Sequence, residues 1–378
     1  MKKTIYLDYN ATAPMRPAVI EMVSGLLGAP LNASSVHKNG REGKRLIDTA
    51  RRQIAALTGA DANNIIFNSG ATEANNTVLK YFADGKVCVS AIEHPSVLEA
   101  RPDAIILPVT PAGIIDLNAA ENIIAQHKPT LVSCQLVNSE TGIIQPVAKI
   151  SQIARKHGAY FHCDAVQAAG RIPLNMMELG IDFMTLSSHK IGGPQGVGAL
   201  VLGLCGETPT LLDGGGQEKK ARAGTENVAG IAGFGLAAEL ALSDLSSPVN
   251  TAPSYVTRLE TALCKMHNNI KIYGKHENGD KNEDLEAAPI IRVPNTTFFS
   301  ITNASSETML MAFDLEGICV SNGSACSSGT VKPSATLKAM GADDAEASSA
   351  IRISTGWNTS QDDIDAFLGA FEKIMARL

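Results

Sequence analysis

The sequence is poor in aromatic residues and carries no excess of positive charge. Phe, Trp and Tyr make up 4% of the 378 residues, which is too few for a surface that stacks nucleic-acid bases. The formal net charge of −6 also gives no basic footprint for nucleic acid. We therefore expect no nucleic-acid partner.

The sequence also lacks closely paired cysteines. Its seven cysteines include no C-x-x-C pair, and Cys88, Cys134 and Cys163 lie in apolar, strand-like runs. A thiol in such a run is expected to be a small buried hydrophobe. Because no disulfide framework or zinc-ligand spacing emerges, we expect a reducing cytoplasm and no bound metal.

Long hydrophobic segments are missing as well. The opening "MKKTIYLDYN" has two lysines but no apolar stretch after them, so we expect no signal peptide. The longest apolar run, "VAGIAGFGLAAELAL" (228–242), is short for a membrane span and contains Glu239. We expect it to be a buried helix, and we expect no membrane partner.

What the sequence does contain is an alternation of strand-like and helix-like segments between about residues 60 and 205. The strand candidates are "NIIFNS", "KVCVS", "AIILPV", "TLVSCQLV", "AYFHCD", "DFMTLSS" and "GVGALVLG". Apolar strands separated by helices predict an α/β fold with a mainly parallel sheet covered on both faces. A Ser- and Pro-rich break near 245–253 predicts a domain boundary, followed by a smaller α+β domain.

Polar clusters directly follow several predicted strands. In open α/β sheets, ligands bind at the carboxyl ends of the strands, so these clusters mark where to look for chemistry. They read "NSGATEAN", "IEHPS", "VNSETG", "HCDAVQ" and "SSHKIGGPQG".

Lys190 stands in the last of these clusters, after a strand and before two glycines. An amine at such a place can form a Schiff base with an aldehyde cofactor, although an ordinary surface lysine would fit the same stretch. Ser187 and His189 beside it could donate hydrogen bonds to a phosphate.

Asp164 ends an apolar strand, where a buried carboxylate needs a partner. The partner could be a protonated pyridine nitrogen, or Asp164 could be a helix N-cap. Gln167, three residues on, fits either a capping box or a donor to the ring hydroxyl of a cofactor.

Two further clusters are less specific. Ala71 and Thr72 open a helix after a strand, and backbone amides at such a turn bind phosphate well. His94 follows another strand, where its imidazole could stack on a planar cofactor, shuttle a proton or simply be a structural histidine.

Cys326 differs from the other cysteines because it lies among small polar residues, in "SNGSACSSGT". Such residues favour a loop over a core. The thiol is therefore expected to be exposed, either by accident of a surface loop or as a nucleophile on a mobile arm.

Together, the lysine, aspartate, histidine, glutamine and phosphate-binding turns predict a pyridoxal-phosphate site. The chain resembles the cysteine desulfurases of the class V aminotransferase family, the NifS and IscS group. The resemblance runs nearly end to end through "YLDYNATAP", "NASSVHKNGR", "SGATEANN", "EHPSV", "SSHKIGGPQGVGAL", "GGGQEKKARAGTEN", "SNGSACSSG" and "IRISTGWN".

This resemblance implies a role for each candidate residue. Lys190 would carry the cofactor, Asp164 would pair with its ring nitrogen, Gln167 would bind the ring hydroxyl, and His94 would stack on the ring. The residues that would hold the phosphate are Ala71, Thr72, Ser187, His189 and, from the other subunit of a homodimer, Thr225.

Arg352 matches the clamp that the family uses for the substrate carboxylate. A planar guanidinium also suits a carboxylate on chemical grounds, although a surface ion pair would explain it too. The family usually has Asn-Asn-Glu where this chain has Asn138, Ser139 and Glu140. The shorter Ser139 could lose the cofactor contact, bridge it by water or leave it to Asn138.

The implied reaction converts L-cysteine to L-alanine. Lys190 acts as base on the α-carbon, Cys326 attacks the substrate sulfur and keeps it as a persulfide, and His94 manages the thiol proton. An acceptor such as an iron–sulfur scaffold protein would take the sulfur. A selenocysteine lyase and a class V aminotransferase are alternatives with the same lysine, and a non-catalytic sulfur-relay scaffold is an alternative of another class.

The resemblance also implies a fold. It is the pyridoxal-phosphate-dependent transferase fold type I, with a mainly parallel seven-stranded sheet in the large domain. The expected division is an N-terminal segment (1–15) packing with the small domain, a cofactor-binding domain (16–248) and a small C-terminal domain (249–378) that carries the Cys326 loop.

Overall fold

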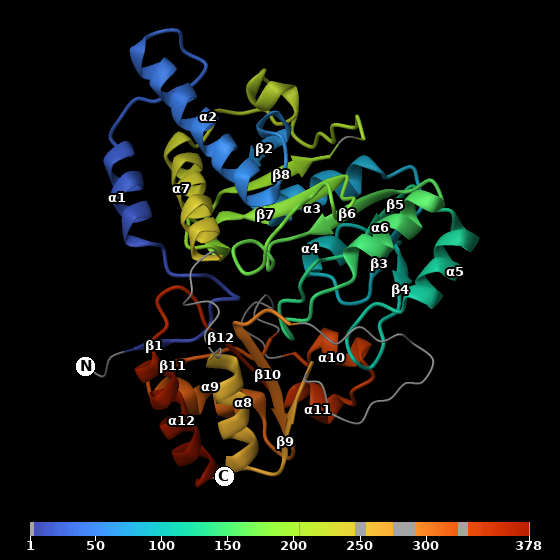
Figure 1. Ribbon diagram of the computed structural model, residues 1–378, viewed down its shortest axis with the longest axis vertical. Helices are drawn as coiled ribbons and strands as arrows, with labels where there is room; N and C mark the ends of the chain where they lie inside the picture. Colours follow the sequence, from blue (N-terminus) through green and yellow to red (C-terminus); the bar gives the residue numbers. More distant parts are fainter. Residues whose placement is uncertain (1–3, 204, 246–254, 275–291, 324–331, 378) are drawn as a thin grey trace.

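The computed structural model describes residues 4–203, 205–245, 255–274, 292–323 and 332–377. In Figure 1 a larger upper part is built around one sheet, with helices on both of its sides, and a smaller lower part holds a second sheet. The N-terminal segment begins in the lower part and then leads up to the first helices of the upper part.

Seven strands form the central sheet, in the order β2-β8-β7-β6-β5-β3-β4. In that order their bounds are Ile65–Asn68, Gly198–Leu202, Phe183–Ser187, Tyr160–Asp164, Leu131–Ser133, Val87–Ser90 and Ile105–Leu107. The neighbours are parallel except where β8 runs antiparallel to β2 and β7. The sheet that the sequence predicts, α/β and mainly parallel, is therefore present.

Helices cover both faces of this sheet, because successive strand residues point to opposite sides and each side is apolar. Within β2, Phe67 packs into one apolar layer and Ile66 into the other. The first layer lies under α1 (Pro17–Leu26), α2 (Lys38–Thr58), α5 (Leu117–His127), α6 (Val147–Lys156) and α7 (Val228–Leu245). The second lies under α3 (Ala71–Tyr81) and α4 (Pro95–Leu98).

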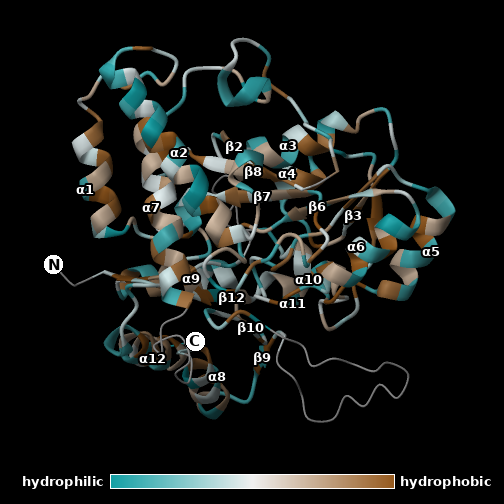
Figure 2. Ribbon diagram, turned by 45° about the horizontal axis from the view of Figure 1, so that its top comes forward, coloured by the Kyte–Doolittle hydropathy of each residue, from teal (hydrophilic) through white to brown (hydrophobic). Residues whose placement is uncertain are grey.

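Helix α7 is mostly apolar, and tan and brown residues predominate along it in Figure 2, although it includes Glu239 and Asp244. Within the described part of the chain it is the helix long and apolar enough to cross a membrane by length and composition. In this structure α7 packs against α1 and α2, and more than half of it is buried. It is the buried helix that the sequence predicts.

The lower part contains the antiparallel sheet β12-β10-β9, with bounds Ala350–Ser354, Thr296–Ile301 and Ile270–Ile272. Its main core lies under α8 (Tyr255–Met266), α9 (Ser306–Leu315) and α12 (Gln361–Met375). In that core the rings of Phe313 and Phe367 stack at 5.1 Å between centroids. The short helices α10 (Ala335–Ala339) and α11 (Asp344–Ser348) contribute to a smaller apolar cluster.

The N-terminal segment joins the lower part by strand pairing. Strand β1 (Ile5–Tyr6) runs parallel to β11 (Ile318–Cys319), and the next residue, Leu7, is fully buried in the main core of the lower part. The predicted boundary near 245–253 lies almost wholly outside the described residues, so the division into domains stays a prediction.

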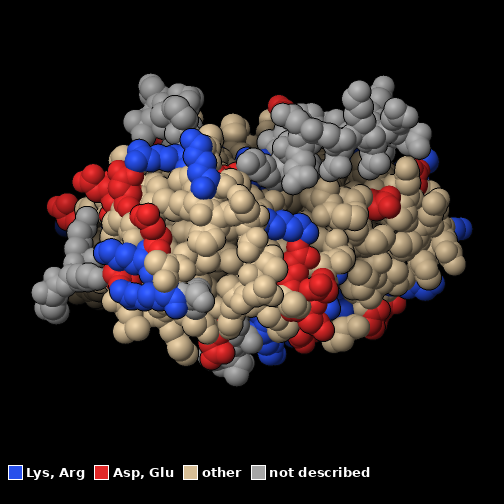
Figure 3. All heavy atoms as spheres, turned by 90° about the horizontal axis from the view of Figure 1, so that it is seen from below, with Lys and Arg blue, Asp and Glu red and all other residues tan. Residues whose placement is uncertain are grey.

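The face seen from below carries both signs of charge. In Figure 3 the basic and acidic side chains lie in small mixed groups, so the described residues of this face form no continuous basic field. Long-range attraction of a polyanion needs such a field.

Candidate active site

Lys190 lies at the carboxyl end of the central sheet, in a 3-10 helix (Ser188–Lys190) that directly follows β7. Its Nζ donates hydrogen bonds to the carbonyl oxygens of Asn10 and Ala11, at 2.6 and 2.8 Å. Both carbonyls belong to the segment after β1. The N-terminal segment therefore fixes the position of the amine, which the sequence pattern did not reveal.

Asp164 is the last residue of β6, the strand beside β7, and is 7% exposed. Its Oδ2 accepts a hydrogen bond from Nδ2 of Asn75 at 2.8 Å, and its Oδ1 accepts one from the amide of Val166 at 3.0 Å. The residues after it form turns and no helix, which excludes the helix N-cap alternative. Asp164 is a buried carboxylate held by two N–H groups.

Gln167 is buried on the turn after Asp164. Its Nε2 donates to the carbonyl of Asn10 at 3.0 Å, and its Oε1 accepts from Arg171. The carbonyl of Asn10 thus accepts from both Gln167 and Lys190. Since no helix begins here, Gln167 is not part of a capping box.

His94 precedes α4 and is connected to Asp164 by side-chain hydrogen bonds. Its Nδ1 lies 2.8 Å from Oγ of Ser96 and accepts from the Ser96 amide at 3.1 Å. The Ser96 hydroxyl is 2.8 Å from Nδ2 of Asn75, which also bonds Asp164. We call these four residues the Asp164–His94 chain; no pattern in the sequence indicated a role for Asn75 or Ser96.

The β2–α3 turn presents a helix N-terminus near this edge of the sheet. Ala71 and Thr72 are the first two residues of α3, and the preceding Gly70, at φ 148°, supplies no capping side chain. A Cβ at Gly198 of β8 would lie 2.6 Å from Cα of Gly70, so only glycine allows this approach. Uncapped amides in a first helical turn suit an anion.

The other three predicted phosphate residues lie in different surroundings. Ser187 is buried at the end of β7, and His189 lies next to Lys190 with its Nδ1 3.1 Å from Oγ1 of Thr12. Burial and the neighbouring Lys190 lower the pKa of His189 to about 4, so its imidazole is neutral at pH 7. Thr225 is exposed, before α7.

The turn after β5 contains Asn138 and Ser139. The Oδ1 of Asn138 accepts from the amides of Glu140 and Thr141 and from the Thr141 hydroxyl. Its Nδ2 donates to the carbonyl of Ile92 at 3.3 Å. The Asn138 amide is thus engaged in holding its own turn, whereas Ser139 is half-buried.

Arg352 of β12 is only 2% exposed. Its Nη2 donates to Oδ1 of Asp8 at 2.7 Å, and its Nη1 donates to the carbonyl of Ser139 at 3.1 Å. Its Nε is buried without a partner among the described residues. The residue predicted to bind a substrate carboxylate therefore already binds the carboxylate of Asp8, which the sequence analysis left without a role.

Glu140 is a second buried carboxylate that the sequence analysis left without a role. It accepts hydrogen bonds from the hydroxyls of Ser334, at 2.5 Å, and Thr336, at 2.7 Å, and burial raises its pKa. A Cβ at Gly323 would lie 2.7 Å from its Oε2. Gly323 and Ser334 stand on either side of residues 324–331, so the predicted nucleophile Cys326 itself lies outside the described residues.

Glu93 lies directly before His94 and is 6% exposed. Its Oε1 accepts from the amide of Gln135 at 2.6 Å, while its Oε2 is buried with no partner among the described residues. Burial raises the pKa of Glu93 to about 8, and the nearby Asp164 contributes to the rise. Glu93 is therefore a largely neutral acid at pH 7.

The three cysteines predicted to be buried are buried. Cys88, Cys134 and Cys163 have no exposed surface, and desolvation raises the pKa of the Cys88 thiol to about 11. A thiol that does not ionise near neutral pH is a poor nucleophile. None of these three cysteines is suited to the chemistry proposed for Cys326.

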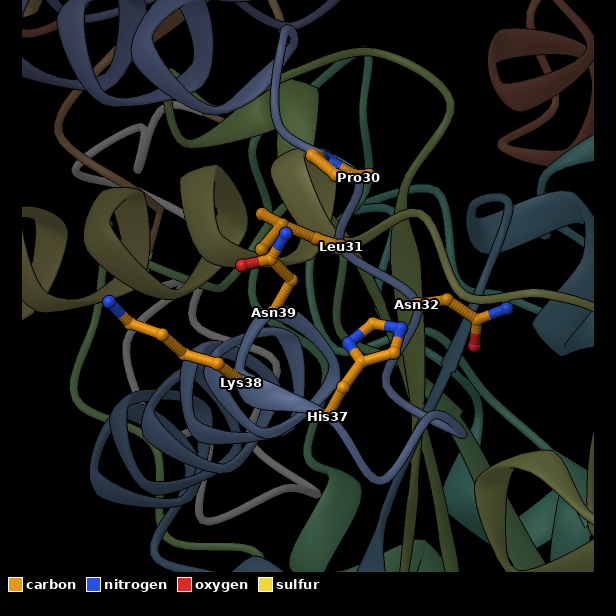
Figure 4. A pocket seen from close by; sticks show the side chains of 6 residues that line it. All are labelled: Pro30, Leu31, Asn32, His37, Lys38 and Asn39. Carbon is orange, nitrogen blue, oxygen red and sulfur yellow. The ribbon is translucent and has the colours of Figure 1, made fainter.

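A surface hollow of about 620 Å³ lies away from these residues (Figure 4). It is formed by the loop before α2 and the first turn of that helix, and its lining residues are Pro30, Leu31, Asn32, His37, Lys38 and Asn39. None of the predicted catalytic or cofactor residues lines it.

Comparison with known proteins places the whole chain among related sequences. Residues 5–367 match the family Aminotransferase class-V. A protein from Dictyoglomus turgidum named cysteine desulfurase IscS is 37% identical, over all of this chain and 96% of that protein. Another of that name, from Methanosarcina thermophila, is 34% identical over all of this chain and 93% of its own length.

Solved structures give the same picture. A NifS-like protein from Rickettsia africae superposes with a TM-score of 0.87 at 39% identity, covering 99% of this chain and all of that one. A structure described as SspA in complex with cysteine superposes with a TM-score of 0.75 at 29% identity, over 93% of this chain and 98% of that one.

Proposed function

Since this chain belongs to the class V aminotransferase family, we propose that it is a pyridoxal-phosphate-dependent cysteine desulfurase that converts L-cysteine to L-alanine. The observation that carries the proposal is the edge of the sheet at β6 and β7. There the carboxylate of Asp164 and the amine of Lys190 come from the ends of adjacent strands. These are the two groups that anchor this cofactor and charge its ring nitrogen.

The described residues fit pyridoxal phosphate. Besides the amine and the carboxylate, the uncapped first turn of α3 offers amides to a phosphate, and Gly198 of β8 lets the backbone of that turn approach the sheet closely. When bound, the cofactor supplies a carbonyl for the substrate amine and an electron-withdrawing ring that acidifies the α-carbon. Ala71, Thr72, Ser187 and His189 would hold the phosphate, and Gln167 would bind the ring hydroxyl.

Lys190 and Arg352 act on the amino-acid part of the substrate. The carbonyls of Asn10 and Ala11 orient Nζ of Lys190, and this nitrogen takes the proton of the α-carbon. Arg352 binds the substrate carboxylate, for which it must share or exchange its bond to Asp8. We assign the usual asparagine contact of the family to Ser139, because the Asn138 amide is engaged within its own turn.

Cys326 is the proposed nucleophile. Its thiolate attacks the substrate sulfur, so that an S–S bond forms while the C–S bond of the substrate breaks. The sulfur remains on Cys326 as a persulfide. The electron pair of the broken C–S bond stays with the β-carbon, which takes up a proton, and the carbon skeleton leaves as alanine.

The wider assignment follows the same family. We propose a homodimer in which Thr225 of one subunit reaches the phosphate held by the other, consistent with its exposed position in the single chain. We propose the type I fold of pyridoxal-phosphate enzymes, with cofactor-binding and C-terminal domains at 16–248 and 249–378. We also propose a cytoplasmic enzyme that passes sulfur to an iron–sulfur scaffold; the six described cysteines are all unpaired.

Two variants test this function. Lys190→Ala is expected to lose the visible absorption of the bound cofactor together with all alanine production. Cys326→Ala is expected to keep the absorption and to lose both persulfide formation and turnover. Full turnover by Cys326→Ala would refute the nucleophile, and a keto-acid product from the unaltered protein would indicate an aminotransferase instead.

A further inference from the structure

The backbone between His94 and Ser96 restricts where the imidazole can carry its proton. The amide of Ser96 donates to Nδ1 of His94 at 3.1 Å. Pro95, the first residue of α4, has no N–H, so the Ser96 amide is the first one in this turn able to donate. Because a backbone N–H only donates, Nδ1 must offer its lone pair and cannot hold a proton.

Asn75 fixes the direction of the side-chain hydrogen bonds. Its Nδ2 lies 2.8 Å from Oδ2 of Asp164 and 2.8 Å from Oγ of Ser96. A carboxylate only accepts hydrogen bonds, and the opposite amide orientation would place Oδ1 of Asn75 against it. Nδ2 therefore faces Asp164, and its second hydrogen is directed at Ser96.

The hydroxyl of Ser96 completes the sequence of donors. Because its oxygen accepts from Asn75, its own proton is free to point toward Nδ1 of His94, 2.8 Å away. The hydroxyl and the backbone amide of Ser96 thus both favour an unprotonated Nδ1. The donors of the Asp164–His94 chain thus point away from Asn75 on both sides. Asn75 donates to Asp164 on one side and to Ser96 on the other, and Ser96 donates to His94.

We propose that Ser96 and Asn75 are positioning residues that hold His94 as the neutral imidazole with its proton on Nε2. A proton on Nδ1, in the other tautomer or in the imidazolium ion, would face the Ser96 N–H. The consequence for catalysis rests on the proposed function: His94 offers a hydrogen-bond donor at Nε2 and does not take the proton of the substrate thiol. This replaces the expectation that His94 manages that proton.

The tautomer is measurable by NMR of the protein labelled with ¹⁵N-histidine, before and after loading with pyridoxal phosphate. The signal of His94 among the eight histidines is identified by its loss in His94→Gln. We expect a protonated-type shift for Nε2 and an unprotonated-type shift for Nδ1 at neutral pH. A protonated-type shift for Nδ1 in the cofactor-free protein would by itself overturn the proposal.

Variants of Ser96 test the positioning role. Ser96→Ala removes one of the two donors to Nδ1, so the two ¹⁵N shifts of His94 should move toward each other, while Ser96→Thr should restore them. The matched control is Ser133→Ala, which removes a buried hydroxyl 2.8 Å from Nδ1 of His162. The control should alter the His162 signal only, and unchanged His94 shifts in Ser96→Ala would refute the role of Ser96.

The outcome separates this inference from the proposed function. If the Nε2-protonated tautomer is found but the protein makes no alanine from cysteine, the function is wrong and the hydrogen-bond assignment stands. If alanine is made and Nδ1 is protonated, the assignment alone is wrong.

Discussion

Two buried polar regions meet at the candidate site, and they are built differently. The Asp164–His94 chain consists of residues that end or follow strands of one sheet, or that lie on the helix after such a strand. The second region, which we call the junction, comprises Asp8, Ser139, Glu140, Ser334, Thr336 and Arg352. It joins four parts of the chain that are up to 344 residues apart in sequence.

The two regions also differ in how they handle charge. In the Asp164–His94 chain, one carboxylate is held by N–H groups and connected through Asn75 and Ser96 to the imidazole of His94. The junction contains the ion pair of the buried Arg352 with the half-buried Asp8, together with the buried, hydroxyl-bonded carboxylate of Glu140. Removing one member of a buried ion pair costs far more than removing one hydrogen bond. Substitutions in the junction should therefore affect stability most.

The largest effect is expected for Arg352→Ala. It leaves Asp8 without its cation and the carbonyl of Ser139 without a donor, and such a change typically costs about 3–5 kcal/mol of unfolding free energy. Urea unfolding measures the loss, and Arg352→Lys should recover part of it. If Arg352→Ala lowered the unfolding free energy no more than the loss of an exposed ion pair does, the pair of Arg352 and Asp8 would not be what stabilises the junction.

Glu140→Ala should rank second. It removes the acceptor of two buried hydroxyls and is expected to cost about 2–3 kcal/mol. Because Gly323 and Ser334 border the segment that carries Cys326, the variant should also slow persulfide formation at Cys326. The cofactor absorption, which depends on Lys190, should stay unchanged. Glu140→Gln, which keeps one acceptor oxygen, is the matched control. It should lose less unfolding free energy and slow persulfide formation less than Glu140→Ala does.

Glu93→Gln tests the surroundings of the Asp164–His94 chain through the pH dependence of the unfolding free energy. Burial raises the folded-state pKa of Glu93 from 4.5 to about 8, so the folded protein binds this proton more tightly than the unfolded chain does. The contribution of Glu93 to stability is then full below pH 4.5 and is lost as the pH rises toward 8. Glu93→Gln should remove that loss. The difference in unfolding free energy, variant minus unaltered protein, should therefore be more favourable to the variant at pH 9 than at pH 5. Parallel stability curves would contradict the assignment.

The smallest effect is expected at an exposed ion pair of the lower part. Lys338 and Asp344 form a 2.5 Å pair, but their side chains are 45% and 83% exposed. Asp344→Asn should change the unfolding free energy by no more than about 0.5 kcal/mol. The result provides the baseline for Arg352→Ala under identical conditions.

The sheet side of the site was largely predictable. Lys190, Asp164 and His94 each follow an apolar strand, and the carboxyl ends of parallel strands meet at one edge. The sequence could not tell a helix N-cap from a site carboxylate at Asp164, because both need an acidic residue after a strand. It also missed Asn75 and Ser96, because their hydrogen bonds depend on how α3 and α4 pack on the sheet.

What the sequence by itself determined is the mainly parallel sheet, the buried helix α7 and the identity of the residues at the strand ends, because apolar periodicity and strand–helix alternation act locally. Only the tertiary structure decided that Asp8 binds Arg352, that the carbonyls of Asn10 and Ala11 hold Lys190, and that Glu140 bonds Ser334 and Thr336. These contacts join residues that lie from 179 to 344 positions apart in the chain. They form only when both sheets and the N-terminal segment pack together, which no local pattern of residues records.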